Sequence, residues 1–347
     1  MTSTSGKWAA TAAVLVAAAT VACGGRADSD AGDPRLASLP IEPQAVTVGG
    51  VSAGGYMAVQ VHVAHSGLFQ GAAVLAGGPY LCAEGSLRHG LGRCMAGEEE
   101  IPTARLLEET SRLALAGAID PIAGLADDRV WIFRGADDAF VGAPVAAALE
   151  TYYQALVTPA QVARLEHPGT GHLVPTANQA NPACTAMEPP FVGNCGLDGA
   201  RTLLAQLYGE LAEGSRPRPD GLISFDQRPY AEAAGSRGLA ANGWLYVPEA
   251  CASGGEAQCR LHVFFHGCKQ GASYVGDAFV KSSGLLEVAE ANRIVLLFPQ
   301  VEPSYQPLNP HGCWDWWGYE GEDYATHDAP QIKAVRAMVG DLLGEAR

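Results

Sequence analysis

The sequence lacks the closely spaced cysteine and histidine pairs that commonly hold a metal, because neither CxxC nor HExxH occurs among its 347 residues. Such spacings are typical of zinc sites, so the sequence predicts no metal centre. It also has few basic residues, with 22 Lys and Arg against 37 Asp and Glu, and a formal net charge of -15. This charge repels phosphate backbones and anionic membranes, which argues against a nucleic-acid partner.

A hydrophobic run long enough to span a membrane is missing as well. The apolar residues 8–22 follow a single cation, Lys7, and are too few and too weakly flanked for a spanning helix. They predict an export signal over residues 1–22. Small residues before Cys23 resemble a bacterial lipoprotein cleavage site, although Thr20 stands where that pattern usually has Leu. Cys23 is therefore either lipidated, as we expect, or cleavage nearby releases the protein, so that the chain is exported to the cell surface, the periplasm or the medium.

No repeat, low-complexity segment or internal linker divides the remaining chain. Residues 23–38 are rich in Gly, Ala and Asp and predict a flexible tether. The hydrophobic content of 48% is ample for a large core. We therefore expect one large domain over residues 39–347.

The most informative stretch of this domain is residues 50–54, which match the GxSxG pattern around Ser52. In such a nucleophile elbow a serine sits on a tight turn between a strand and a helix, with its hydroxyl exposed above the sheet. The apolar run at residues 45–48 predicts the strand, and apolar residues at helical spacing follow the turn (57, 61, 64 and 68). Ser52 is thus the predicted nucleophile, and a glycine-rich structural turn is the alternative.

Two later strand ends supply the partners that a serine hydrolase needs. The apolar run 130–133 leads to Asp137 and Asp138, and the alternating run 161–165 leads to His172 in a glycine-rich loop. The order Ser, Asp, His is that of the α/β hydrolases. Either aspartate can orient the histidine, since the other is free to cap the helix that follows.

The loop that forms the oxyanion hole normally precedes the nucleophile, but here it comes late. An apolar strand at 261–265 leads into His266-Gly267-Cys268, a turn that can aim a backbone N–H at the site. The apolar run 71–76 predicts the strand after the elbow helix, a further parallel strand is expected at 294–299, and the residues from 222 onward complete the same sheet. The sequence therefore predicts a circularly permuted α/β-hydrolase fold with a mostly parallel, doubly wound sheet.

The cysteines other than Cys23 number eight, and an even number in an exported chain is typical of disulfides. Proximity along the chain favours three pairs and leaves a fourth, so the expected bridges are Cys82 with Cys94, Cys184 with Cys195, Cys251 with Cys259, and Cys268 with Cys313.

Five segments, GVSAGGYMA, AGGPYLCA, GTGH, HGCKQG and GCWDWWGY, resemble the motifs of extracellular poly(3-hydroxybutyrate) depolymerases, in particular the single-domain, circularly permuted form. The resemblance covers most of residues 40–347. It implies a triad of Ser52, Asp138 and His172, and an oxyanion hole formed by the N–H groups of Ala53 and Cys268. It also implies hydrolysis of a polyester through an acyl-enzyme, without a cofactor.

Several questions of substrate stay open at this point. Feruloyl and acetylxylan esterases share the fold and some motifs, so a short-chain ester is an alternative to the polyester, and a non-catalytic polymer-binding surface lipoprotein is an alternative of another class. The membrane would be reached only through a lipid on Cys23. Trp314, Trp316 and Trp317 are predicted either to line a substrate groove or to pack a disulfide-braced loop, and Tyr56 is predicted to contact the substrate.

Overall fold

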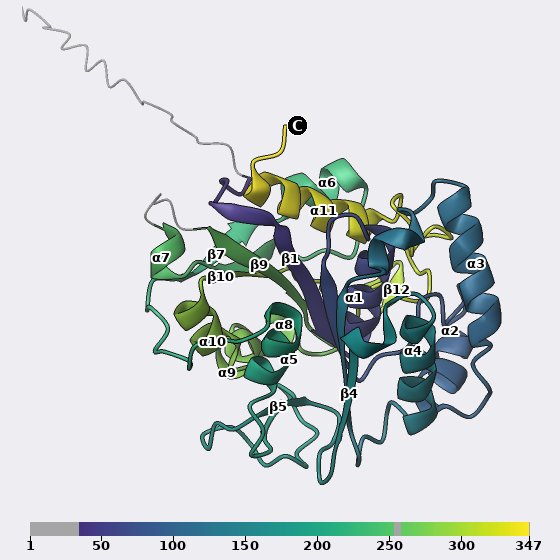
Figure 1. Cartoon of the computed structure of the whole chain (residues 1–347), viewed down its shortest axis with the longest axis horizontal. Helices are drawn as coiled ribbons and strands as arrows, with labels where there is room; N and C mark the ends of the chain where they lie inside the picture. The colour runs from purple at the N-terminus through teal and green to yellow at the C-terminus, as the bar shows by residue number, and fades with distance from the viewer. Residues whose placement is uncertain (1–34, 253–257, 347) are drawn as a thin grey trace, which may run out of the picture. The chain divides into compact units, whose positions relative to one another are not determined.

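An eight-stranded sheet runs through the computed structural model, which describes residues 35–252 and 258–346 (Figure 1). Its strand order is β4-β3-β2-β1-β9-β10-β8-β7. Neighbouring strands from β4 to β10 are parallel, and β8 and β7 are antiparallel to the strands beside them. The strands are β1 (Ile41–Val51), β2 (Gly71–Leu75), β3 (Arg129–Gly135), β4 (Val162–His167), β7 (Leu222–Asp226), β8 (Asn242–Tyr246), β9 (Cys259–Phe265) and β10 (Ile294–Phe298). Two small pairs lie outside this sheet, β5 (Val174–Thr176) with β6 (Val192–Asn194), and β11 (Ser304–Tyr305) with β12 (Leu308–Asn309).

Helices cover both faces of the sheet, as a doubly wound fold requires (Figure 1). One core contains residues of α1, α3, α4 and α11, and the other contains residues of α5, α9 and α10. The helices are α1 (Ala53–Ala64), α2 (Leu87–His89), α3 (Thr103–Leu115), α4 (Ala143–Gln154), α5 (Gly199–Tyr208), α6 (Arg228–Ala234), α7 (Glu249–Ala252), α8 (Ala272–Val275), α9 (Ala278–Ser282), α10 (Leu285–Asn292) and α11 (Pro330–Leu343). No helix in the described ranges combines the length and the apolar character that a membrane span requires.

Strand β2 shows why the central strands are apolar without interruption. Ala72 and Val74 pack in one core, while Ala73 and Leu75 pack in the other. Successive side chains of a strand point to opposite faces, so a strand covered on both faces needs apolar residues at every position. The run at 71–76 predicted this strand correctly.

The order of strands fits the predicted circular permutation. Strand β1 is first in the sequence but central in the sheet, where it pairs in parallel with β2 on one edge and with β9 on the other. The register places Gly50 opposite Phe265, so the turn after β1 and the turn after β9 lie side by side. The late loop at 266–268 thereby reaches the position that an earlier loop occupies in other α/β hydrolases.

Two glycines allow the turn at Ser52 to pack against the end of β9. A Cβ added to Gly54 would overlap the carbonyl oxygens of Phe265 and His266, and a Cβ on Gly50 would overlap the carbonyl oxygen of Gly54. Real Cβ atoms do not approach backbone oxygens so closely. Glycine is therefore needed at both positions to let the backbones approach one another.

All four expected disulfides are present, Cys82–Cys94, Cys184–Cys195, Cys251–Cys259 and Cys268–Cys313. The last joins residues 45 positions apart, and it ties the loop after β9 to the tryptophan-rich segment. Cross-links of this kind stabilise a fold by about 2–4 kcal/mol each.

The packed chain begins earlier than expected. Leu36, placed in the predicted tether, is buried, and its amide donates to the Tyr230 hydroxyl at 2.7 Å. A short apolar segment beside a Gly- and Asp-rich stretch carries little sequence signal, so the boundary at residue 39 is corrected toward the N-terminus. The predicted export signal, Cys23 and the rest of the tether lie outside the described residues.

Gly54→Ala should lower the free energy of unfolding by about 1–3 kcal/mol or more, because the new methyl group forces the turn at Ser52 away from β9. Urea unfolding followed by tryptophan fluorescence measures the change. Gly321→Ala is the matched control, since an added Cβ there meets no heavy atom within 4 Å, and it should change the free energy of unfolding by less than about 0.5 kcal/mol. Equal losses in the two variants would contradict the packing argument.

Candidate active site

Ser52 lies at the sharp turn between β1 and α1. Its backbone has φ 58° and ψ -125°, a conformation that residues with a side chain seldom adopt. The turn is held by the Ser52 amide, which donates to the Leu75 carbonyl at 2.8 Å. Such strain persists where the surroundings fix it, and it is common at active sites. The predicted tight turn between a strand and a helix is thus present, and the role of Ser52 as the nucleophile stays a prediction.

His172 and Asp138 form a hydrogen-bonded pair. The distance from His172 Nδ1 to Asp138 Oδ2 is 2.8 Å, and Asp138 Oδ1 accepts from the amides of Phe140 and Val141 at 2.8 and 2.9 Å. Asp137 is exposed, and its amide donates to the Thr170 carbonyl. Of the two adjacent aspartates, Asp138 is therefore the one that contacts the histidine.

The surroundings of Asp138 favour its ionised form. Burial alone would raise the pKa of this carboxyl, but the hydrogen bond and charge of His172, together with the amides of Val141 and Phe140, outweigh it and lower the pKa. An ionised carboxylate only accepts hydrogen bonds, so His172 Nδ1 carries the proton. Nε2 is then the nitrogen with a free lone pair.

The loop that carries His172 is held against the end of β3. A Cβ on Gly135 would overlap the carbonyl oxygens of Thr170 and Gly171, so glycine permits this contact. The Gly171 amide donates to the carbonyl of Cys184, which is cross-linked to Cys195. The histidine is thus positioned by strand β3 on one side and by a disulfide-braced loop on the other.

The loop after β9 is fixed by two buried side chains. His266 Nε2 accepts from the Val301 amide at 3.2 Å, so its Nδ1 carries the proton and donates to the Gly267 carbonyl at 2.7 Å. Burial lowers the pKa of His266 to about 4, partly offset by that hydrogen bond, which keeps the ring neutral at neutral pH. Because a trans peptide is planar, holding the Gly267 carbonyl also fixes the N–H of Cys268, which points the opposite way. The Gly267 amide in turn donates to Gln270 Oε1.

A small hollow of about 20 Å³ brings the predicted groups together. It is lined by Val51, Ser52, His172, Phe191, Cys268 and Gln270. Ala53, whose amide is the other expected oxyanion donor, follows Ser52 as the first residue of α1. Phe191 and Gln270 are lining residues that sequence reasoning missed, although Gln270 stands within the HGCKQG segment.

The expected aromatic substrate wall is only partly compatible with the structure. Trp314 is fully buried and packs edge-on against Phe265, with ring centroids 4.7 Å apart. Tyr56 and Trp316 are also buried and stack on one another at 4.2 Å. The packing alternative therefore holds for Trp314 and Trp316, and the expectation for Tyr56 is corrected, because its ring face is covered by another ring. Trp317 is half-buried, and its contact with substrate stays a prediction.

A serine at the tight turn after β1, a buried aspartate after β3 and a histidine after β4, in that order along the chain, define it as an α/β hydrolase of the serine class. No family model matches it. It is 41% identical over 307 residues to the poly(3-hydroxybutyrate) depolymerase of Delftia acidovorans, covering 88% of this chain and 60% of that protein's length. It is 32% identical over 325 residues to the polyhydroxybutyrate depolymerase of Talaromyces funiculosus, covering 89% of this chain and 92% of the relative.

Solved structures agree with these relatives. The PHB depolymerase from Penicillium funiculosum has a TM-score of 0.83 and 30% identity, over 89% of this chain and 99% of that chain. A serine-to-alanine variant of a PHB depolymerase, complexed with an R3HB trimer, gives the same values. The chain belongs to the poly(3-hydroxybutyrate) depolymerase family.

Asp138→Asn should lower kcat by about 10⁴-fold, the effect of neutralising a carboxylate that orients a catalytic histidine. Asp137→Asn is the matched control, because the neighbouring carboxylate is exposed and makes no contact with His172 among the described interactions. Initial rates on a soluble p-nitrophenyl ester measure both. A larger loss of kcat in Asp137→Asn than in Asp138→Asn would show that Asp137, and not Asp138, orients the histidine.

Removing the Cys268–Cys313 bridge, by Cys268→Ser with Cys313→Ser, should cost roughly 2–5 kcal/mol of stability. It should also lower kcat by up to about 10²-fold, since a displacement near 1 Å at a reacting centre has that effect. The control pair Cys251→Ser with Cys259→Ser opens a bridge at the opposite end of β9. Thermal unfolding and kcat are measured on both double variants. If the variant without the Cys268–Cys313 bridge loses stability but no more kcat than the control, the bridge does not position the catalytic groups.

Proposed function

We propose that this chain is an exported serine esterase that hydrolyses poly(3-hydroxybutyrate) and its oligomers. The observation that supports this most directly is the hydrogen-bonded Asp138–His172 pair beside Ser52, in one hollow with Cys268. A related PHB depolymerase has been solved with its serine replaced by alanine and an R3HB trimer bound. A catalytic triad accounts for the arrangement of these side chains, and a polyester substrate accounts for the trimer bound to the related protein.

In the proposed reaction Ser52 Oγ attacks an ester carbonyl of the polymer while His172 Nε2 takes the hydroxyl proton. Asp138 holds the Nδ1 proton and stabilises the imidazolium that forms. The N–H groups of Ala53 and Cys268 stabilise the negative oxygen, each contributing about 2.7–4 kcal/mol. His172 then protonates the leaving alcohol, which departs as the shortened chain. Water, activated by the same histidine, cleaves the acyl-enzyme and releases a hydroxyacid end.

The shape of the site favours a flexible aliphatic polyester over a bulky aromatic ester. The hollow beside Ser52 holds only about 20 Å³, whereas sites that enclose a drug-sized ligand measure about 300–1,000 Å³. An aromatic acyl group such as feruloyl has no enclosed space there within the described residues. A chain of small repeating units can instead cross an open hollow, with one ester at a time at the serine.

Export is supported by the four disulfides, which are typical of oxidising compartments. The lipid anchor on Cys23 remains a proposal, because that residue lies outside the described chain. Residues 1–22 as the signal, 23–35 as the tether and the remainder as one catalytic domain complete the proposed organisation. The substrate would be met outside the cytosol.

Ser52→Ala should abolish release of 3-hydroxybutyrate from polymer films while leaving thermal unfolding nearly unchanged, because it removes only a hydroxyl from a turn. The wild type should react with a fluorophosphonate probe and the variant should not. Ser111→Ala is the control, since among residues 35–252 and 258–346 its hydroxyl bonds only to the Leu107 carbonyl, within α3. Full activity of a cleanly purified Ser52→Ala protein would disprove the serine mechanism.

The same assay separates the substrates. Wild-type protein is given poly(3-hydroxybutyrate) film, R3HB oligomers, short p-nitrophenyl esters and feruloyl esters in parallel. We expect polymer and oligomer hydrolysis to persist and feruloyl turnover to be at least tenfold slower. Feruloyl hydrolysis without polymer hydrolysis would favour the other esterase class, and labelling without any hydrolysis would favour a polymer-binding role.

A further inference from the structure

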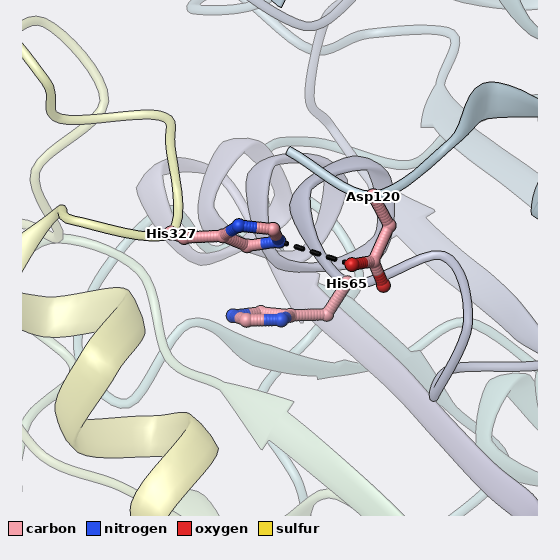
Figure 2. A group of neighbouring side chains, drawn as sticks. All are labelled: His65, Asp120 and His327. Atoms are coloured by element: carbon pink, nitrogen blue, oxygen red, sulfur yellow. Dashed lines mark ion pairs between the residues drawn. The ribbon is translucent and has the colours of Figure 1, made fainter. Parts of the chain in front are cut away.

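A second cluster of reactive side chains lies at the far end of the elbow helix. His65 follows the last residue of α1, Asp120 lies in the segment after α3, and His327 lies shortly before α11 (Figure 2). One ligand atom from each lies within 4.8 Å of the others. Because Ser52 precedes the first turn of the same 12-residue helix, the cluster stands roughly 18 Å from the hydroxyl that the proposed reaction uses.

The two imidazole rings lie face to face, with the carboxylate beside them (Figure 2). Their centroids are 4.7 Å apart with an interplanar angle of 29°. His327 Nε2 lies 3.2 Å from Asp120 Oδ1 and 2.6 Å from the Ala64 carbonyl. Asp120 is further held by the Gly67 amide, which donates to Oδ2 at 2.9 Å. Backbone contacts thus fix the carboxylate and one of the two rings.

The other ring has an unused nitrogen. His65 Nε2 is buried and has no hydrogen-bond partner among the described residues. A buried polar atom without a partner costs about 1–3 kcal/mol, so such atoms call for an explanation, and an ion is one of the common ones. A neutral imidazole has one nitrogen with a free lone pair, and a nitrogen without a hydrogen-bond partner is available to bind a metal ion.

We propose that His65, Asp120 and His327 bind a divalent transition-metal ion, with Zn²⁺ as the best match. Two imidazole nitrogens and one carboxylate oxygen are the donor set that zinc and its neighbours in the first transition row prefer. Ligands at 2.0–2.2 Å from a tetrahedral ion lie roughly 3.3–3.6 Å apart, so atoms that now lie within 4.8 Å of one another need to close by up to about 1.5 Å. Because the lone pair of an imidazole lies in the plane of its ring, the stacked rings must also turn toward one another. His327 gives up its contact with the Ala64 carbonyl and turns Nε2 to the ion.

Space and charge around the cluster permit this. Hollows of about 310 and 410 Å³ are both lined by His65 and His327, and they leave room for water as a fourth ligand. The neighbouring cations are balanced by acids, since Arg336 pairs with Glu345 at 2.8 Å and Lys333 lies 3.7 Å from Asp328. These cations therefore do not offset the negative charge of Asp120, which is available to the ion.

The ion would act as a brace. It joins the end of α1 to two segments that are far from it in the sequence, and so it ties down the helix whose other end carries the serine turn. No atom of the proposed reaction touches it. The inference is independent of the proposed function, because metal binding is measurable in a protein that hydrolyses nothing.

The test uses full-length protein without a histidine tag, stripped with EDTA and titrated with Zn²⁺ by isothermal titration calorimetry. We expect one ion per chain and a rise in unfolding temperature, since an ion at 100 times its Kd shifts the folding equilibrium by about 100-fold. X-ray absorption of the loaded protein should show two imidazole ligands. Absence of saturable one-to-one binding would overturn the proposal.

Variants locate the site. His65→Gln, His327→Gln and Asp120→Asn should each weaken binding by at least about 100-fold, since even outer partners of a metal ligand are worth 10–100-fold. Asp120→Asn keeps an acceptor for the Gly67 amide. We therefore expect this variant to fold even if a histidine variant does not. His311→Gln removes an exposed imidazole elsewhere and should bind as the wild type does. Unchanged binding in Asp120→Asn, or equal loss in His311→Gln, would show that Zn²⁺ binds elsewhere on the surface.

Discussion

The parallel pairing of β1 with β9 is the interaction on which the rest of the structure depends. It joins the strand that ends at Ser52 to the strand that ends at His266, and deep in the sheet it also places the Thr47 hydroxyl 2.8 Å from His262 Nδ1, 215 positions away in the sequence. A slip of one residue in this register would send every side chain of β9 to the opposite core. It would also move the Cys268 amide by about 3.3 Å along the strand, which is far more than the oxyanion hole proposed for this amide would tolerate.

Much of this arrangement could be predicted from the sequence because the signals are local. Strands buried on both faces appear as unbroken apolar runs, which is why 71–76, 130–133 and 294–299 were recognisable. The carboxyl ends of parallel strands meet at one edge of a sheet, so polar residues placed just after such runs converge there without further information. Three pairs of cysteines lie close together in the sequence, and once these were paired, only one fourth disulfide was possible.

The remainder depended on contacts that no local pattern carries. Asp137 and Asp138 are chemically identical neighbours, and only the path of the turn decides which one is buried against His172. Tyr56 and Trp316 are large amphipathic rings suited equally to a groove or a core, and their partnership became visible only when the two segments met. His65, Asp120 and His327 show no metal-ligand spacing, because three separate connections bring them together.

The position of β1 in the chain has a consequence for how the protein is made. Chains emerge N-terminus first, so the serine turn is synthesised early, whereas the strand that covers its other edge is among the last of the sheet to appear. Until then β1 exposes a row of unpaired backbone groups and apolar side chains, which is the condition under which strands pair with the wrong partner. Closing contacts across such long sequence separations is slow. A nascent or truncated chain that stops before residue 266 thus holds Ser52 without the loop that we propose as its oxyanion hole, and the proposed site is complete only after residues 266–268 have been added.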